Sequence, residues 1–426
     1  MMAVKRFFRI YLIIGKTFNI WFSTIPVAIM ILLLRIIIAI GMLVDKFLFW
    51  SLKRPLKNPI IIVGNPRSGT TFLHRFLIHH NVGVGSELWQ LLYPSITIQK
   101  FIKPLLPYLE RMSPAKYHST EAHKTSLDSV ETDDVSLLFR YLDGFFLYGF
   151  FLTFDEEDLF KWVDPKIRDT SSRDFRWLQE MWSRNTISNR SDRYIGKLFS
   201  LSSNLPAFQK FFPDSKILYL IRDPLSVIPS GLSLVTGVLD KRFNFWSLKK
   251  EIRDRFILRL YKALVELLNR FHDDWVKGKI EKEKVMIIKY DLMMSDFELV
   301  MREIITFTET ENNDELTAAI KKIIMDAIKN DTKAEATYTL DLVRKKYGVG
   351  PLALAAKANN IADLKAWIKF RVLCDPDRQT SIYSVLHSVE TLLHSVRTRV
   401  MTVYLLCQLC GNSVNTLLDD FPETRV

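Results

Sequence analysis

Residues 60–73 read IIIVGNPRSGTTFL, an apolar run followed by a loop rich in small residues. The run from Ile60 to Val63 is β-branched throughout, which is typical of a short strand buried on both faces. Gly64 and Gly69 allow tight turns, and a helix-like run follows them. A loop of this kind directs backbone N–H groups inward and sets the positive end of a helix dipole against a phosphate. The stretch therefore predicts an anion-binding loop between a strand and a helix.

The loop differs from the one found in nucleoside triphosphatases. That loop has Lys-Ser or Lys-Thr after its second glycine, and the lysine reaches the β- and γ-phosphates. Here Thr70 and Thr71 follow Gly69, and the cation is Arg67 within the loop. The difference argues against a triphosphate ligand and makes a P-loop kinase the less favoured enzyme alternative.

Two more apolar runs, 216–221 and 285–288, resemble buried strands and alternate with helix-like stretches. Between them, residues 252–275 place apolar side chains at helical spacing, which predicts an amphipathic helix packed on the sheet. Strands that alternate with helices are typical of βαβ units with a parallel sheet. The pattern predicts an α/β fold whose folded domain begins near residue 58.

The loop resembles that of the sulfotransferases that use 3′-phosphoadenosine 5′-phosphosulfate (PAPS), whose 5′-phosphosulfate loop has the form Pro-Lys/Arg-Ser-Gly-Thr-Thr. Residues 66–71 match this form. The family's second signature, a strand ending in Arg-(Asp/Asn)-Pro with a later Ser, is matched by residues 222–224 and Ser230. The resemblance implies a P-loop-like three-layer sandwich with a central parallel sheet. It also implies that no metal is required and that PAPS is the co-substrate, with its 5′-phosphosulfate held by Arg67, Ser68, Gly69, Thr70 and Thr71 and its 3′-phosphate held by Arg222 and Ser230.

Two shorter matches support the same family. Residues 212–214, Phe-Pro-Asp, resemble the lead-in to the phosphate-binding strand, and residues 289–292, Lys-Tyr-Asp-Leu, resemble the family's Tyr-Glu-Asp-Leu element. The resemblance extends by motif placement over residues 59 to 350.

The catalytic residues match the family less completely. Soluble members have Lys-Thr-His before the phosphate-binding Arg, and this chain has Lys197-Leu198-Phe199, so that Lys197 matches the Lys and Phe199 replaces the His. The resemblance implies that Lys197 contacts the bridging oxygen or the sulfonate; the alternative is a solvated lysine at a strand end.

The general base has two candidates. Glu87 is the leading candidate, because the branch that includes protein-tyrosine and glycan sulfotransferases uses a Glu shortly after the first helix, and Glu87 lies at a comparable distance from the loop; the alternative is a structural carboxylate at a helix start. His123 is the second candidate, because it precedes an acidic stretch (residues 131–134) similar to that of bacterial and lipid-acting relatives, and a histidine can act as a base near neutral pH.

The N-terminus carries a localisation signal. Residues 25–44 are apolar except for Arg35, long enough to cross a bilayer as a helix. A membrane span is the preferred interpretation, and the alternative is a helix lying in the interface, which the aromatic and basic residues of 5–22 and Arg35 would suit. The sequence leaves the side open: a bacterial inner membrane with the domain facing the cytoplasm, or a Golgi membrane with the domain facing the lumen.

Composition and patterning divide the rest of the chain. The formal net charge of +12 favours anionic partners, but the basic residues are dispersed and we find no nucleic-acid recognition motif. Three cysteines (Cys374, Cys407 and Cys410) are too few for a disulfide framework, which favours a reducing compartment. We predict a membrane anchor with a basic linker over residues 1–57, a sulfotransferase domain over 58–350, and a helical C-terminal extension over 351–426.

The acceptor is not defined by the sequence. We expect a hydroxyl or amine on a carbohydrate, a lipid or another membrane-proximal molecule, and residues 93–182, rich in Phe, Leu and Tyr, are a candidate apolar acceptor pocket. The non-enzymatic alternative is a nucleotide-binding membrane scaffold that has lost its base.

Overall fold

The computed structural model of the chain describes residues 2–53, 56–112, 126–311 and 315–320. Its centre is a parallel sheet with the strand order β2-β1-β3-β4. The strands are β1 (Ile60–Val63), β2 (Ile195–Lys197), β3 (Lys216–Ile221) and β4 (Val285–Lys289). Ile61 of β1 pairs with Gly196 on one side and with Ile217 on the other. The three predicted strands are confirmed, and the short β2 joins them at one edge.

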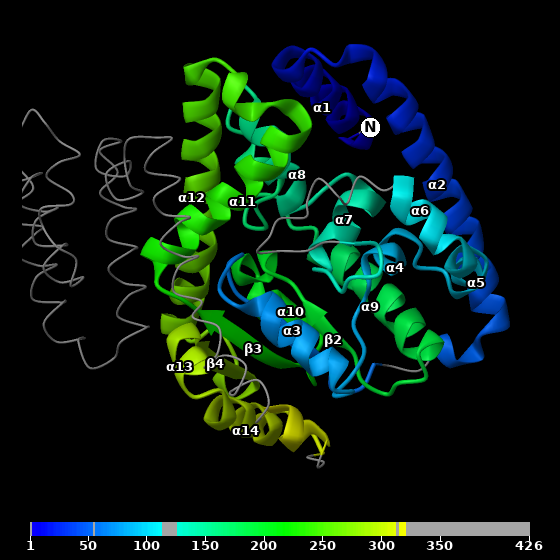
Figure 1. Cartoon of the computed structure of the whole chain (residues 1–426), viewed down its shortest axis with the longest axis vertical. Helices are drawn as coiled ribbons and strands as arrows, with labels where there is room; N and C mark the ends of the chain where they lie inside the picture. The colour runs from blue at the N-terminus through cyan, green and yellow to red at the C-terminus, as the bar shows by residue number, and fades with distance from the viewer. Residues whose placement is uncertain (1, 54–55, 113–125, 312–314, 321–426) are drawn as a thin grey trace, which may run out of the picture.

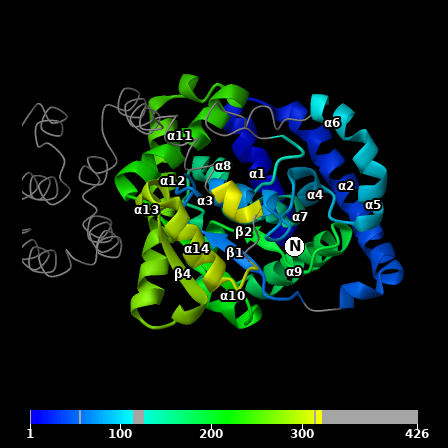
Figure 2. The same ribbon diagram turned by 60° about the horizontal axis from the view of Figure 1, so that its bottom comes forward.

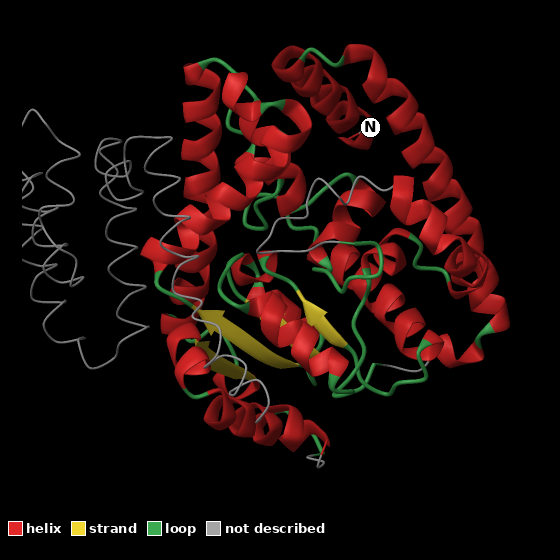
Figure 3. Ribbon diagram, in the orientation of Figure 1, coloured by secondary structure: helices red, strands yellow, loops and turns green. Residues whose placement is uncertain are grey.

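Helices surround this sheet, as Figures 1 and 3 show. In chain order they are α1 (Met2–Phe18), α2 (Trp21–Leu48), α3 (Thr70–His79), α4 (Leu88–Leu92), α5 (Ile96–Ile102), α6 (Leu106–Met112), α7 (Asp134–Tyr141), α8 (Phe145–Phe150), α9 (Ser171–Ser188), α10 (Leu205–Phe211), α11 (Pro224–Phe243), α12 (Lys250–Val276), α13 (Tyr290–Ser295) and α14 (Phe297–Phe307).

Alternate side chains of each strand enter separate layers of core. Ile61 and Val63 of β1 belong to the larger cluster, together with side chains of α9, α10 and α12. Ile60 and Ile62 belong to a second cluster with α3 and α14. Successive side chains of a strand point to opposite faces, so the sheet is the middle layer of a three-layer α/β sandwich, as expected.

Helix α12 confirms the helical pattern of residues 252–275. Its apolar positions recur every three or four residues and are buried against the sheet, among them Phe256, Leu260, Leu264 and Phe271. The ring of Phe271 stacks on Tyr219 of β3, with ring centroids 3.5 Å apart. The periodicity of the apolar residues was sufficient to predict this helix, because one continuous face of the helix packs against the core.

The first two helices pack on the domain. Ile10, Ile13 and Ile14 of α1 are buried in the same core cluster as the β1 side chains. Helix α2 is long and apolar enough to cross a membrane by length and composition, and it lies along the outer flank of the molecule in both Figure 1 and Figure 2. The division at residue 58 stays a prediction, and the predicted extension over 351–426, with all three cysteines, lies outside the described residues.

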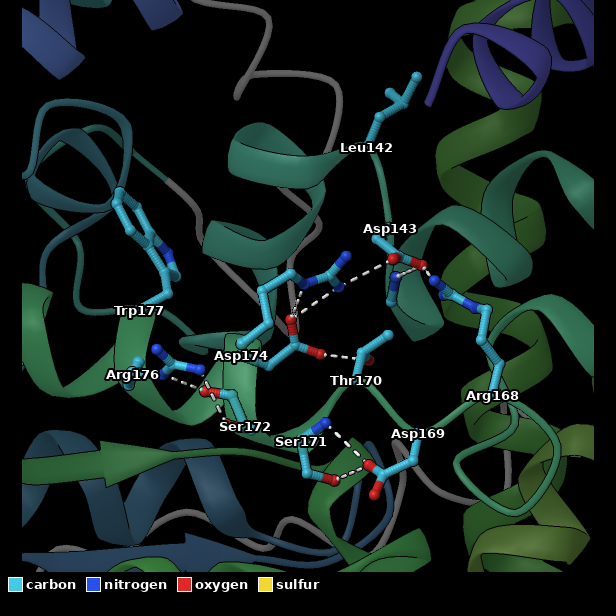
Figure 4. A network of polar contacts seen from close by, with 12 residues as sticks. Leu142, Asp143, Arg168, Asp169, Thr170, Ser171, Ser172, Asp174, Arg176 and Trp177 are labelled. Atoms are coloured by element: carbon cyan, nitrogen blue, oxygen red, sulfur yellow. Dashed lines mark hydrogen bonds and ion pairs between the residues drawn. The ribbon is translucent and has the colours of Figure 1, made fainter. Parts of the chain in front are cut away.

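A buried carboxylate ties α1 to the insertion between β1 and β2. Asp143 forms ion pairs with Arg6 of α1 at 2.6 Å, with Arg168 at 2.5 Å and with Arg173 of α9 at 2.8 Å. Figure 4 shows the side chain of Arg168 directed at Asp143. Burial raises the pKa of Asp143, but the charges and hydrogen bonds of the arginines outweigh burial and hold this pKa below its usual value. The cluster positions the start of α8, since Asp143 also accepts a hydrogen bond from the Gly144 N–H at 2.9 Å.

Candidate active site

The predicted anion-binding loop lies between β1 and α3. Gly69 adopts a φ of +90° and precedes Thr70, the first residue of α3. The first helical hydrogen bond runs from the Leu73 N–H to the Gly69 carbonyl at 3.2 Å. The N–H groups of the preceding helical residues, Thr70 to Phe72, therefore have no acceptor within the helix and face its N-terminal end. This is the geometry of an anion site at a helix N-terminus.

Ser68 braces the loop. Its hydroxyl donates to the Asn65 carbonyl at 2.7 Å, its N–H donates to the same carbonyl at 3.2 Å, and the residue is 1% exposed. The Asn65 side chain in turn donates to the Leu264 carbonyl of α12 at 3.0 Å. In this structure the Ser68 hydroxyl therefore fixes the path of the loop, and the role of Ser68 in holding the 5′-phosphosulfate stays a prediction.

Gly64 is required by close packing at the start of the loop. Its φ is +145°, and an added Cβ would lie 2.5 Å from the Leu220 carbonyl of β3. A side chain at this position would push the loop away from the neighbouring strand. The glycine therefore lets the loop follow the carboxyl edge of the sheet closely.

The two predicted phosphate-binding motifs meet directly. Arg67 donates from Nε to the Ser230 Oγ of α11 at 2.9 Å, and its own backbone adopts a φ of +77°. Arg222, directly after β3, donates from Nη1 to the Arg67 carbonyl at 3.0 Å. The structure thus brings Arg67, Arg222 and Ser230 together at the carboxyl ends of β1 and β3, where ligands of open α/β sheets bind.

Tyr290 supports this arrangement from α13. The Arg222 guanidinium lies 4.2 Å from the centroid of the Tyr290 ring, a cation–π contact. A Cβ added to Gly69 would lie 2.9 Å from Cδ2 of the same ring. The Lys-Tyr-Asp-Leu element that resembled a family motif therefore packs against both the loop and Arg222.

Lys197 ends β2 beside the loop. Its Nζ donates to the Thr71 Oγ1 at 3.1 Å, and the residue is 5% exposed. Burial lowers the pKa of Lys197, whereas the nearby Glu131 carboxylate raises it. Lys197 is therefore a buried group at the start of α3, and the alternative of a solvated strand-end lysine is wrong.

Two buried carboxylates hold the end of β2. Asp133 accepts hydrogen bonds from the Lys197 N–H at 2.9 Å and the Tyr194 hydroxyl at 2.7 Å. Asp134 accepts from the Phe199 N–H at 2.8 Å. Burial raises the pKa of Asp133 to about 7, although the bonds from Tyr194 and Lys197 act in the opposite direction. These aspartates position Lys197 through its backbone.

Glu131 is a carboxylate that the sequence analysis did not single out as a base. Its Oε1 lies 3.1 Å from Arg75 Nη2, and it accepts a hydrogen bond from Ser129 at 3.0 Å. Arg75 follows Thr71 by one helical turn on α3, so both lie on the same face of that helix. The next residue, Thr132, donates from its hydroxyl to the Lys197 carbonyl at 2.9 Å, so this part of the chain lies beside the end of β2. The sequence feature that could have indicated Glu131 is the acidic stretch of residues 131–134.

Glu87, the predicted base, is the N-cap residue that precedes α4. Its N–H donates to the Gln90 side chain at 2.9 Å, and its carboxylate accepts a hydrogen bond from the Trp89 indole. Burial raises the pKa of Glu87, as does the charge of Asp128, while Lys103 lowers it. These partners belong to the segment 87–128 and not to the anion-binding loop. His123, the second candidate, lies outside the described residues.

An aromatic group lies next to the end of β2. Phe145 and Phe146 of α8 each contact Phe199 edge-on, with centroids 5.4 Å apart in both pairs. Other large side chains of the insertion, such as Tyr148, Phe154 and Trp182, are buried in the core. An acceptor pocket formed by residues 93–182 stays a prediction. Within the described ranges, no group of three metal-ligating side chains is found.

Comparison with known proteins agrees with this geometry. A family model described as "Sulfotransferase family" matches residues 59–314. The omega-hydroxy-beta-dihydromenaquinone-9 sulfotransferases of Mycobacterium bovis and Mycobacterium tuberculosis are 25% identical to the chain over 252 residues. The match covers 58% of this chain and 61% of each relative, so it spans about three fifths of their length.

A solved structure supports the fold. The crystal structure of a sulfotransferase from Mycobacterium avium superposes with a TM-score of 0.52 at 19% identity, over 74% of this chain and 78% of that one. The chain belongs to the sulfotransferase family, and its domain has the α/β architecture of that family.

Proposed function

We propose that this protein transfers a sulfonate group from PAPS to a hydroxyl of a membrane lipid. The observation that carries the proposal is the convergence of three separate motifs: Arg67 bonds Ser230, Arg222 bonds the Arg67 carbonyl, and Lys197 bonds Thr71. These groups surround the N-terminus of α3. The family implies PAPS as the donor.

The residues fit a donor with phosphates at two positions. The N-terminus of α3 offers backbone N–H groups, and Arg67, Arg222 and Lys197 supply positive charge within one region. Arginine forks and hydroxyls bind phosphate oxygens with directional hydrogen bonds. Ser68 supports this site by fixing the loop through the Asn65 carbonyl.

The bound donor supplies an activated sulfonate, and the acceptor oxygen forms a bond to sulfur as the bond between sulfur and the phosphate oxygen breaks. Lys197 offsets negative charge that develops on the transferring and leaving groups. Glu131 takes the proton of the acceptor hydroxyl. The ion pair with Arg75, at 3.1 Å, holds the Glu131 carboxylate in position for this role.

A lipid acceptor is supported by two observations. The mycobacterial relatives are named for an omega-hydroxylated menaquinone, an apolar molecule with a hydroxyl group. Phe145, Phe146 and Phe199 provide apolar surface beside the end of β2, where Lys197 lies. A membrane location, suggested by the apolar helix α2, would give the enzyme access to such an acceptor.

The reaction is tested with radiolabelled PAPS and the full-length protein. Label from the sulfonate should enter the organic phase when an omega-hydroxylated menaquinone is the acceptor, and adenosine 3′,5′-bisphosphate should form in equal amount. A parallel reaction with γ-labelled ATP tests the kinase alternative. Label that enters only water-soluble carbohydrate would reject the lipid acceptor, and transfer from ATP in place of PAPS would reject the donor.

A further inference from the structure

Helix α2 has two different faces along its whole length. Exposed apolar residues recur every three or four positions at Ile25, Ile29, Leu32, Ile36, Ile40 and Leu43, each between 45% and 59% exposed. We call these six residues and their exposed neighbours on α2 the outer face. From Phe22 to Val44, the outer face carries no charged residue. Apolar surface of this extent on a soluble domain marks a contact with a partner or a membrane.

The opposite face of α2 is fixed to the domain by polar contacts. Arg35 donates from Nε to the Phe139 carbonyl at 2.6 Å. Asp45, which is 0% exposed, accepts hydrogen bonds from the Thr97 N–H at 2.9 Å and from Arg184 Nε at 3.1 Å. Arg184 also donates to the Met42 carbonyl at 3.1 Å. These contacts join the second half of α2 to segments that follow it by more than fifty positions.

The preceding helix is fixed as firmly. Arg9 of α1 donates to both carboxylate oxygens of Asp155, at 2.6 and 2.7 Å. Arg6 forms its ion pair with Asp143 at 2.6 Å. Helices α1 and α2 are therefore bonded to the domain at the beginning and at the end of the pair. Their orientation in a membrane is coupled to the orientation of the domain.

A transmembrane orientation conflicts with these contacts. A bilayer core of about 30 Å takes up roughly 20 residues of a helix, so it would enclose most of the 28 residues of α2. It would also enclose the parts of α5, α7 and α9 that pack on α2, with Lys100, Arg140 and Glu180. Charged side chains in hydrocarbon are costly. The helix is therefore better placed in the plane of the membrane, where only its outer face meets lipid.

The edges of this surface suit anionic headgroups. Lys16 and Lys46 lie near the two ends of α2, and both are exposed. Beside α2 (Figures 1 and 2), α5 and α6 carry Phe101 and Tyr108, which are 71% and 64% exposed. Aromatic residues favour the headgroup level of a bilayer, and basic residues are attracted to anionic lipid.

We propose that the outer face of α2 lies flat on an anionic phospholipid bilayer and holds the enzyme there as a monotopic protein, with both ends of α2 on the same side. Its 28 residues extend for about 42 Å along the surface. This inference extends the membrane location of the proposed function. Its tests need no turnover, so it and the proposed reaction can fail separately.

The orientation is tested by labelling single cysteines on either side of α2. Lys5→Cys and Lys57→Cys, at exposed positions, are introduced into a full-length chain whose Cys374, Cys407 and Cys410 are replaced by serine. A membrane-impermeant maleimide is applied to right-side-out and inside-out membrane vesicles. We expect both cysteines to react in the same type of vesicle. Reaction of the two in opposite types would mean that α2 spans the membrane and would overturn the proposal.

The lipid contact is tested with a matched pair of variants. Ile40 on the outer face and Val276 at the end of α12 are 59% and 63% exposed. Binding of the purified variants is measured on phosphatidylcholine vesicles with and without phosphatidylglycerol. We expect Ile40→Lys to lower the partition coefficient on the order of tenfold, and Val276→Lys to leave it unchanged. Equal binding of Ile40→Lys and the wild type, or binding indifferent to phosphatidylglycerol, would overturn the proposal.

Discussion

Replacing Lys197 by methionine isolates the role of the buried cation at the start of α3. Lys197 lies 3.1 Å from the Thr71 hydroxyl and is 5% exposed, so its ammonium is held in place with little water around it. Methionine has a similar length and needs no hydrogen-bond partner. The substitution therefore removes the charge while it keeps most of the packing.

The size of the effect follows from this geometry. A preorganised donor directed at developing charge in a site that excludes water contributes about 2.7–4 kcal/mol to the transition state. We therefore expect kcat to fall by about 10²–10³-fold. The melting temperature should change little, because methionine fills the space of the lysine stem and Glu131 keeps its ion pair with Arg75.

The pH dependence gives a second measure of the same group. Burial lowers the pKa of Lys197 below its usual value of 10.5. The cation is present below this lowered pKa and is lost as the pH rises through it. The wild-type enzyme should thus lose activity on the alkaline side before pH 10.5, and Lys197→Met should lack that decline.

The assay is steady-state formation of adenosine 3′,5′-bisphosphate with saturating PAPS. Lys216→Met is the matched control, since Lys216 is also a strand lysine but lies at the amino end of β3 and pairs with Glu309 at 3.2 Å. It should retain the wild-type kcat. A Lys197→Met enzyme that keeps kcat within about threefold of the wild type would refute the assignment of this cation to the transition state.

Three further changes test other parts of the molecule. Glu131→Gln should lower kcat by about 10²–10⁴-fold with unchanged affinity for the bisphosphate, whereas Glu87→Gln should retain most activity; the reverse result would assign the base to Glu87. Asp45→Ala should lower the free energy of unfolding by about 3 kcal/mol, because the buried Arg184 loses its nearer carboxylate, keeping Glu180 at 3.6 Å, and the Thr97 N–H loses its acceptor. Lys46→Ala removes an exposed ion pair and should lower the free energy of unfolding by at most about 1 kcal/mol. If urea unfolding shows a loss for Asp45→Ala as small as that for Lys46→Ala, the docking of α2 is contradicted. Burial lowers the pKa of His74 from 6.5 to about 3, so its contribution to stability is complete above pH 6.5 and lost as the pH falls toward 3. The free energy of unfolding should fall by about 1.4 kcal/mol per pH unit in this range, and His74→Gln should reduce this dependence on pH. If melting curves at several pH values show the same dependence in His74→Gln, His74 is not its source.

The central sheet and its main helix were predictable because their signals are local. The runs at 60–63, 216–221 and 285–288 are continuous and apolar, and α12 has one apolar face over its full length. The strand β2 has only three residues, Ile195 to Lys197, and one of them is glycine. Its place at the edge is determined by pairing with β1 and by the buried Asp133, neither of which is a local pattern.

The site was predictable where residues belong to motifs. The positions of Arg67, Arg222 and Ser230 followed from the resemblance, and the structure places them in contact. The inward direction of the Ser68 hydroxyl did not follow, because it depends on the backbone path of the loop. The location of Glu131 beside Lys197 likewise depends on how residues 126–136 fold back toward β2.

The docking of α2 could not be predicted from its composition. Residues 25–44 satisfy the length and hydropathy of a membrane span, whereas Arg35 and the aromatic and basic residues of 5–22 favoured an interfacial helix. The partners of Arg35 and Asp45 are Phe139 and Arg184, more than a hundred positions away. Polar contacts over such separations leave no periodic signal in the sequence.

The most direct test of the donor site is calorimetric titration of the full-length protein with adenosine 3′,5′-bisphosphate and with ATP. We expect the bisphosphate to bind more tightly than ATP and Arg222→Ala to weaken this binding by on the order of a hundredfold, since a charge-assisted bond to phosphate is lost along with the contact to the Arg67 carbonyl. Tighter binding of ATP, or an affinity for the bisphosphate that is unchanged in Arg222→Ala, would contradict the proposal that PAPS is the donor bound at this site.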